Sequence, residues 1–223
     1  TASLRTMLAT VVAVLLVAGP ALAFDQIERK STKTATRGKI TSVSRIAVTI
    51  KPSTSPALTV PANEIVSIRW DGEPSKLLLG RAAERTGRFE TALKTYNECD
   101  ADPKATGDIK TNIQFLIARA TAGAALAGNA KLDEARDKLV AFLKRGGDHF
   151  RYFDAVHLLG RVELARGKHD EAQVQFELLA KAPWTDYQLA ARSAKAQLLL
   201  AKNQLAQAQA EYQAVIDASR NAK

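Results

Sequence analysis

The sequence predicts a mainly α-helical protein, in which about four antiparallel helical hairpins follow a small antiparallel β-barrel-like module. Three observations lead to this fold class. The composition changes once, near Pro74, from residues rich in Thr, Ser, Ile and Val to residues rich in Ala, Leu, Gln, Lys and Arg. Before this point apolar and polar residues alternate as in strands, and after it a pattern with helical spacing repeats. We therefore divide the chain into a leader 1–23, a β module 24–74 and a helical repeat domain 75–223.

The overall composition excludes several classes of protein. The chain has 223 residues, of which 46% are apolar and 25% charged, and it contains one cysteine. Collagen-like, disulfide-stabilised and wholly disordered chains all differ strongly from these values. Cys99 has no internal disulfide partner, so we expect it to fill a seam between helices as a small apolar residue.

The first 23 residues have the layout of a secretory signal. Arg5 precedes an apolar run from Met7 to Ala18, interrupted only by Thr10, and the small residues Ala21 and Ala23 come just before the first polar residues. Twelve apolar residues would span about 18 Å as a helix, less than the roughly 30 Å of a bilayer core. We therefore expect a signal peptide cleaved after Ala23 and a periplasmic or extracellular protein. A signal retained as a membrane anchor is the alternative.

The β module contains at least four short segments with strand patterns. Apolar and polar residues alternate in a stretch that carries Ile46, Val48 and Ile50, and again in one that carries Val66, Ile68 and Trp70. Shorter runs at 37–43 and 58–61 complete the pattern. This arrangement is similar to SH3-like and Sm-like barrels. Because so small a module buries little core, we expect it to pack against the first helix of the helical domain.

A repeated pattern organises the helical domain. Two segments begin with Leu-Gly and keep the same later spacings, and two weaker copies keep mainly their second half. The alanines at equivalent positions are 43, 37 and 36 residues apart, which is the period of helical hairpin arrays. The strong copies are Leu79, Gly80, Gly87, Phe89, Ala92 and Tyr96, then Leu159, Gly160, Gly167, His169, Ala172 and Phe176; the weak copies centre on Ala135 and Ala208.

At these positions the chain resembles the tetratricopeptide repeat (TPR) family, whose unit is a helical hairpin of about 34 residues. The resemblance implies an α-solenoid with a concave groove that binds a peptide or protein segment, lined by exposed residues of the first helices. We identify no asparagine at the positions with which some family members clamp a carboxylate, so the resemblance implies only a basic groove for an acidic segment. The groove residues that it implies are Arg81, Arg85, His157, Arg161, Leu164 and Gln197.

The sequence contains no pattern typical of catalysis. It has no Gly-rich phosphate loop, no Gly-x-Ser-x-Gly elbow and no paired-cysteine motif. His149, His157 and His169 have spacings that do not bring them to one metal ion. We therefore expect no enzyme activity, no metal site and no cofactor.

The charge indicates the kind of partner. The formal charge is +9, and the segment from Phe24 to Lys51 contributes seven basic and two acidic residues. No aromatic residues interleave these cations, so we expect anionic envelope polymers or lipid head groups there rather than nucleic acid. The sequence thus predicts a protein-binding scaffold of the cell envelope with an acidic protein or peptide partner. The alternative is a self-associating component of envelope assembly or cell division, present as a homo-oligomer.

Overall fold

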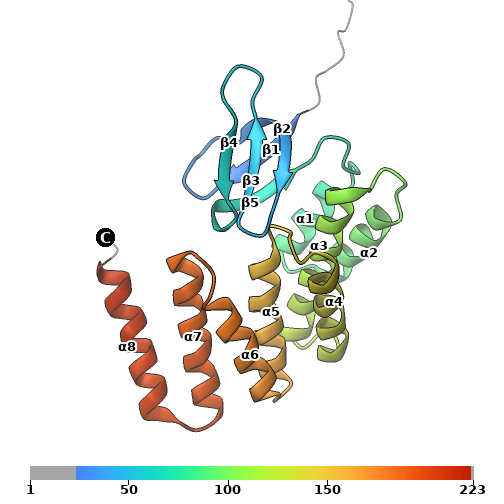
Figure 1. Cartoon of the computed structure of the whole chain (residues 1–223). Coiled ribbons are helices and arrows are strands. Elements are labelled where there is room, and N and C mark those ends of the chain that lie inside the picture. Colours follow the sequence, from blue (N-terminus) through green and yellow to red (C-terminus); the bar gives the residue numbers. More distant parts are fainter. Residues whose placement is uncertain (1–23, 222–223) are drawn as a thin grey trace, which may run out of the picture.

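The computed structural model describes residues 24–221, so the expected export signal at 1–23 lies outside the described residues. A small β sheet stands beside the first hairpins of a curved row of helices, and the row ends at α8 (Figure 1). The predicted fold class, helical hairpins preceded by a small antiparallel β module, is confirmed.

The β module is one five-stranded sheet with the strand order β4-β3-β2-β1-β5, and all neighbouring strands are antiparallel. The sheet is not closed into a barrel, because β4 and β5 lie at its two edges. A short 3-10 helix, Ala62–Glu64, connects these edge strands. The strands are β1 (Asp25–Arg29), β2 (Thr36–Val43), β3 (Ala47–Lys51), β4 (Leu58–Pro61) and β5 (Ile65–Arg69).

The alternation in the sequence identifies most of the core of this module, with two errors. Val48 and Ile50 are fully buried, as the alternation predicts, whereas Ile46 and Val66 are half exposed. Ile46 lies in the turn before β3, where the Ser44 hydroxyl accepts a hydrogen bond from the backbone N–H of Ala47. Val66 lies where the pairing of β5 with β1 shifts register, which turns its side chain away from the core.

Within the described residues, up to Asn221, the helical domain consists of eight helices in four consecutive hairpins. The long interval between the first two repeats arises from α3, which has 20 residues and is longer than the other first helices. The helices are α1 (Leu77–Arg85), α2 (Phe89–Asp100), α3 (Gly107–Leu126), α4 (Leu132–Arg145), α5 (Tyr152–Ala165), α6 (His169–Leu179), α7 (Thr185–Ala201) and α8 (Leu205–Asn221).

The small residues of the repeat pattern lie where helices approach closely. A Cβ atom added at Gly80 in α1 would lie 2.5 Å from Cε1 of Tyr96 in α2, and Gly160 in α5 faces the ring of Phe176 in α6 in the same way. Cys99 is buried in the core that α2 shares with its neighbours, as expected for a seam residue. The Gly and aromatic positions of the two strong copies therefore fix the crossing of α1 with α2 and of α5 with α6, whereas Leu79 is 66% exposed.

The β module docks on the helical domain through residues that are far apart in the sequence. Phe150, from the loop between α4 and α5, is buried in the core of the β module. Ile109 of α3 and Trp184, which precedes α7, pack against the same core. α1, the helix expected to pack against the module, contributes a polar contact through Arg81, whereas the apolar contacts come from these later elements. This docking places β5 beside α1, α3 and α5.

Candidate binding cleft

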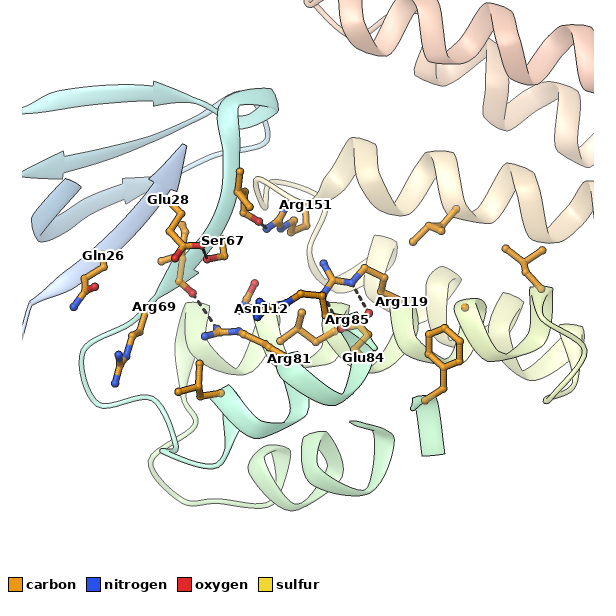
Figure 2. Close-up of a pocket in the computed structure, with 18 of the residues that line it drawn as sticks. Gln26, Glu28, Ser67, Arg69, Arg81, Glu84, Arg85, Asn112, Arg119 and Arg151 are labelled. Atoms are coloured by element: carbon orange, nitrogen blue, oxygen red, sulfur yellow. Dashed lines mark hydrogen bonds and ion pairs between the residues drawn. The ribbon is translucent and has the colours of Figure 1, made fainter. Parts of the chain in front are cut away.

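A basic cleft of about 960 Å³ lies between the β module and the first helices of the hairpins (Figure 2). Strands β1 and β5 form one side, and helices α1, α3 and α5 form the other. Two glutamates, Glu28 and Glu84, also line it. The arginines that line the cleft outnumber these two acids. These arginines are Arg69, Arg81, Arg85, Arg119, Arg151 and Arg161.

Arg81, one of the predicted groove residues, holds the β module to α1. Its Nη1 and Nη2 atoms donate hydrogen bonds to the two carboxylate oxygens of Glu73, at 2.8 and 3.0 Å. Nη2 also donates to the carbonyl oxygen of Ile68 in β5, at 2.9 Å. Because the side chain is only 14% exposed and its donors are used, Arg81 contributes mainly to the architecture of the cleft.

Arg151 makes an equivalent contact at the other end of β5. Its Nη2 atom donates to the carbonyl oxygen of Val66 at 2.6 Å, and Nη1 donates to that of Ile65 at 3.3 Å. Asp154 accepts a further bond from Nη1 at 2.9 Å. Since β5 is an edge strand, its outward carbonyls could pair with another strand. The guanidinium groups of Arg81 and Arg151 occupy these carbonyls instead. The carbonyls of Ile65, Val66 and Ile68 are therefore already engaged within the protein.

Arg119 is fixed by a bidentate ion pair. Its Nε and Nη2 atoms each lie 2.7 Å from a carboxylate oxygen of Glu84, and the hydroxyl of Tyr96 donates to the same carboxylate at 2.7 Å. Burial opposes the charge of Arg119, yet the hydrogen bonds and charge of Glu84 raise the pKa of this guanidinium. Burial, followed by the charge of Glu84, raises the pKa of Tyr96. Arg119 therefore stays charged and Tyr96 stays protonated at neutral pH.

Three cations and one amide in the cleft remain available to a ligand. Arg69, Arg85 and Arg161 are exposed and make no ion pair or side-chain hydrogen bond within residues 24–221. Asn112 of α3 is only 4% exposed, and its amide makes no side-chain hydrogen bond to any described residue. Figure 2 shows Asn112 in the middle of the cleft, near Arg81 and Arg85. An amide that lines a cleft and makes no side-chain hydrogen bond can form one with a ligand.

The sequence does not single out Asn112 or Arg69. Asn112 lies in the second repeat, where the degenerate pattern indicates Ala120 and Ala124 as groove residues, and the structure buries both of them away from the cleft. Arg69 belongs to the β module, and no spacing in the sequence relates a strand residue to a groove between helices. Only the docking of the two parts brings them to one cleft.

The cleft also offers apolar surface. Leu78 of α1 and Val66 of β5 both line it and are about half exposed. Phe89 and Leu158 line it as partly buried residues. Apolar side chains next to free arginines suit a ligand that carries both carboxylate and apolar groups.

The structure brings only half of the predicted groove residues together. Arg81, Arg85 and Arg161 line the cleft, whereas the other three lie outside it. Burial, and then the charge of Arg161, lowers the pKa of His157, so this imidazole adds no positive charge at neutral pH. Leu164 packs against the core formed by α6 and α7, and Gln197 is exposed on α7. The role of all six in binding a partner stays a prediction.

Two further kinds of feature are absent from residues 24–221. In that part of the chain, no group of three His, Cys, Asp or Glu side chains is placed to hold a metal ion. None of the helices described there combines the length and the apolar character needed to span a bilayer.

Comparison with known proteins supports the fold. The chain matches no family model and no curated protein sequence. It is similar to two solved structures from Podosopora anserina, both described as a putative kinesin light chain with nearly identical TPR-like repeats, one of them a point variant. Each is 21% identical with a TM-score of 0.50, and the match covers 66% of this chain and 74% of the other. At this identity the likeness shows the fold alone, and the chain therefore contains a TPR-like helical repeat fold.

Proposed function

We propose that the protein is a non-enzymatic interaction scaffold that binds an acidic segment of a protein partner in the basic cleft. The observation that carries this proposal is that Arg85 and Arg161 line the cleft without a counter-ion among the described residues. TPR-like repeat arrays present concave surfaces between repeats, which suits such a role.

The electrostatics of the cleft favour an acidic ligand. Arg81, Arg119 and Arg151 are already balanced by Glu73, Glu84 and Asp154, so a ligand meets the uncompensated charges of the other arginines, Arg69, Arg85 and Arg161. A cleft with walls of low dielectric concentrates the field of such charges and attracts oppositely charged groups from a distance. Guanidinium groups also bind carboxylates with two parallel hydrogen bonds, which gives geometric selectivity.

The proposal includes export to the cell envelope. It rests on the signal-like leader, from Arg5 to Ala23, and not on the described residues. We expect the mature protein in the periplasm or outside the cell, beginning at Phe24. Fractionation of cells that express the full chain tests this, since replacing both Ala21 and Ala23 by bulky residues should leave an uncleaved precursor.

Peptide binding tests the cleft directly. The probe is a fluorescent acidic peptide of about six residues, with glutamates and one or two leucines, whose binding is followed by anisotropy. We expect the double variant Arg85→Ala with Arg161→Ala to weaken binding by about tenfold, because two uncompensated cations are lost. Added salt should weaken the wild-type complex.

The matched control removes the same charge elsewhere. Lys94 in α2 and Lys181 after α6 are exposed and do not line the cleft. Replacing both by alanine should leave binding within about twofold of wild type. An equal loss in the two double variants would mean that net charge alone attracts the peptide, and the cleft would then not be the binding site.

One observation favours the alternative function, self-association. Helix α8 is the last helix among the described residues, and its residues Leu205 and Ile216 are 61% and 45% exposed. Exposed apolar side chains on one helix offer a surface on which another molecule can pack. If α8 mediates assembly, sedimentation should show oligomers at micromolar concentration that Leu205→Glu with Ile216→Glu dissolves. A monomer at all concentrations would exclude this alternative.

A further inference from the structure

The outer face of the sheet carries a second group of unpaired cations. In the register of the sheet Gln26 of β1 lies opposite Arg69 of β5 on one side and Arg37 of β2 on the other. Lys39, two residues after Arg37, lies opposite Lys51 of β3. Side chains two residues apart on a strand share a face. Arg69, Arg37, Lys39 and Lys51 therefore lie on one face, opposite the face that buries Ile27 and Ile50.

These four cations lack local compensation. None of them makes an ion pair or a side-chain hydrogen bond within residues 24–221, and all four are exposed. Lys39 and Lys51 lie directly opposite each other, and like charges in that position destabilise a sheet. Glu28 shares the face and adds one negative charge; its carboxylate accepts a hydrogen bond from Ser67 at 2.7 Å and makes no ion pair with a described residue, so four cations face one acid. A bound anion would relieve the repulsion between the two lysines.

The cleft opens onto this face. Gln26 and Arg69 line the cleft and also belong to the row that crosses the sheet. Figure 2 shows both side chains at the end of the cleft nearest the β module. The arginines of the helical domain and the cations of the β module thus form one continuous basic track, which joins residues that the sequence assigns to separate parts.

We propose that the acidic segment bound in the cleft continues across the outer face of the sheet, where its carboxylates contact Arg69, Arg37, Lys39 and Lys51. This inference rests on the proposed function of the cleft. The cleft follows α3 from Asn112 to Ala127, which is about 22 Å at 1.5 Å per residue. The four strands from β5 to β3 add about 14 Å at roughly 4.8 Å per strand. An extended segment of about eleven residues covers both.

The shape of the track favours a polypeptide over a lipid surface. A planar bilayer could contact the outer face of the sheet, but it could not enter the cleft between β5 and the helices. An extended chain can follow both surfaces, because its side chains alternate in direction and reach cations on either side.

The experiment compares two acidic peptides with two groups of variants. A peptide of about six residues extends for about 20 Å and fills only the cleft, whereas one of about fourteen residues extends for about 46 Å and reaches the sheet. In the full mature chain, we expect Arg37→Ala with Lys39→Ala and Lys51→Ala to weaken binding of the long peptide by about tenfold. The same triple variant should change binding of the short peptide by less than about twofold.

Two controls accompany this measurement. The first is a charge-retaining variant, Arg37→Lys with Lys39→Arg and Lys51→Arg, which should bind the long peptide like wild type. The second, Lys94→Ala with Lys181→Ala and Arg220→Ala, removes the same charge away from the track. Since the substituted side chains are exposed, all variants should fold.

The outcomes separate the two proposals. If the triple variant binds both peptides like wild type while the Arg85 and Arg161 variant binds them weakly, the track is wrong and the cleft proposal stands. If neither peptide binds wild type, both proposals fail. If vesicles with an anionic lipid bind through Arg37, Lys39 and Lys51 while the two peptides bind equally well, the outer face is a lipid-binding surface and the track is again wrong.

Discussion

Nη2 of Arg151 donates a hydrogen bond of 2.6 Å to the carbonyl oxygen of Val66, and this bond ties the helical domain to the edge strand of the β module. The Arg151 side chain is almost fully buried, and the donor is charged. Charged hydrogen bonds of this kind contribute more than neutral ones, and removal of the donor leaves buried acceptors without a partner.

We therefore expect Arg151→Leu to lower the free energy of unfolding by about 3 kcal/mol, because two β5 carbonyls and Asp154 lose their donor. Denaturation by urea measures this change. Arg161→Leu is the matched control, since Arg161 is exposed and unpaired among the described residues, and it should cost less than about 0.5 kcal/mol. Equal effects of the two substitutions would show that Arg151 does not hold the modules together.

His149 should make stability depend on pH. The pKa of His149 is lowered to about 3, first by burial and then by the positive charge of Arg151. The charge of Asp154 opposes this shift. Its Nδ1 atom accepts a hydrogen bond from the backbone N–H of Arg151 at 3.2 Å, which places the ring proton on Nε2. Below about pH 6.5 the unfolded chain binds a proton that the native imidazole does not bind. Stability from this group is thus complete above that pH and decreases toward pH 3.

The measurement compares urea denaturation of wild type and His149→Gln at pH 7 and pH 5. Since the variant lacks the titrating group, the stability difference between the two proteins should shift by about 2 kcal/mol in favour of the variant at pH 5. The comparison cancels the titration of His157, whose pKa is also lowered by burial and which both proteins contain. A stability difference that is equal at both pH values would contradict the buried neutral state of His149.

Gly80→Ala should destabilise the first hairpin although alanine is the better helix former. The added Cβ would lie 2.5 Å from the ring of Tyr96, so α1 and α2 must separate. Overpacking costs about 1 to 3 kcal/mol and the gain in helix propensity offsets about 1 kcal/mol of it, so we expect a net loss of up to about 2 kcal/mol in urea denaturation. Gly147→Ala serves as control, because the nearest atom to its added Cβ is at 3.5 Å, and it should have little effect.

Glu84→Gln should change stability and binding in opposite directions. The substitution removes the carboxylate that holds Arg119 and accepts the Tyr96 hydroxyl, so the free energy of unfolding should fall by about 1 to 2 kcal/mol. It also leaves one more positive charge in the cleft, so the short acidic peptide should bind a few-fold more tightly. Glu90→Gln, at an exposed residue outside the cleft, should change neither quantity by much. Weaker peptide binding by Glu84→Gln would contradict the electrostatic account of the cleft.

The hairpins could be predicted from the sequence because their signal is local. The Leu-Gly and Ala-aromatic positions contact each other within one hairpin, as Gly80 and Tyr96 do, so their spacing is constrained along the chain. Strand β1 could not be delimited, because Ile27 is the one apolar residue of its five and no alternation can be read from it. The exposure of Val66 could not be predicted either, because a register shift depends on the partner strand.

The sequence by itself determined the helical hairpins, the strand segments and the excess of basic residues, since these follow from periodicity and composition. Only the tertiary structure decided which arginines are free. Arg81 and Arg151 are engaged by Glu73, Asp154 and β5, whereas Arg85 and Arg161 have no such partner among the described residues. The physical reason is that docking through Phe150, Ile109 and Trp184 joins residues distant along the chain, and ion pairing depends on proximity in space rather than on spacing in sequence.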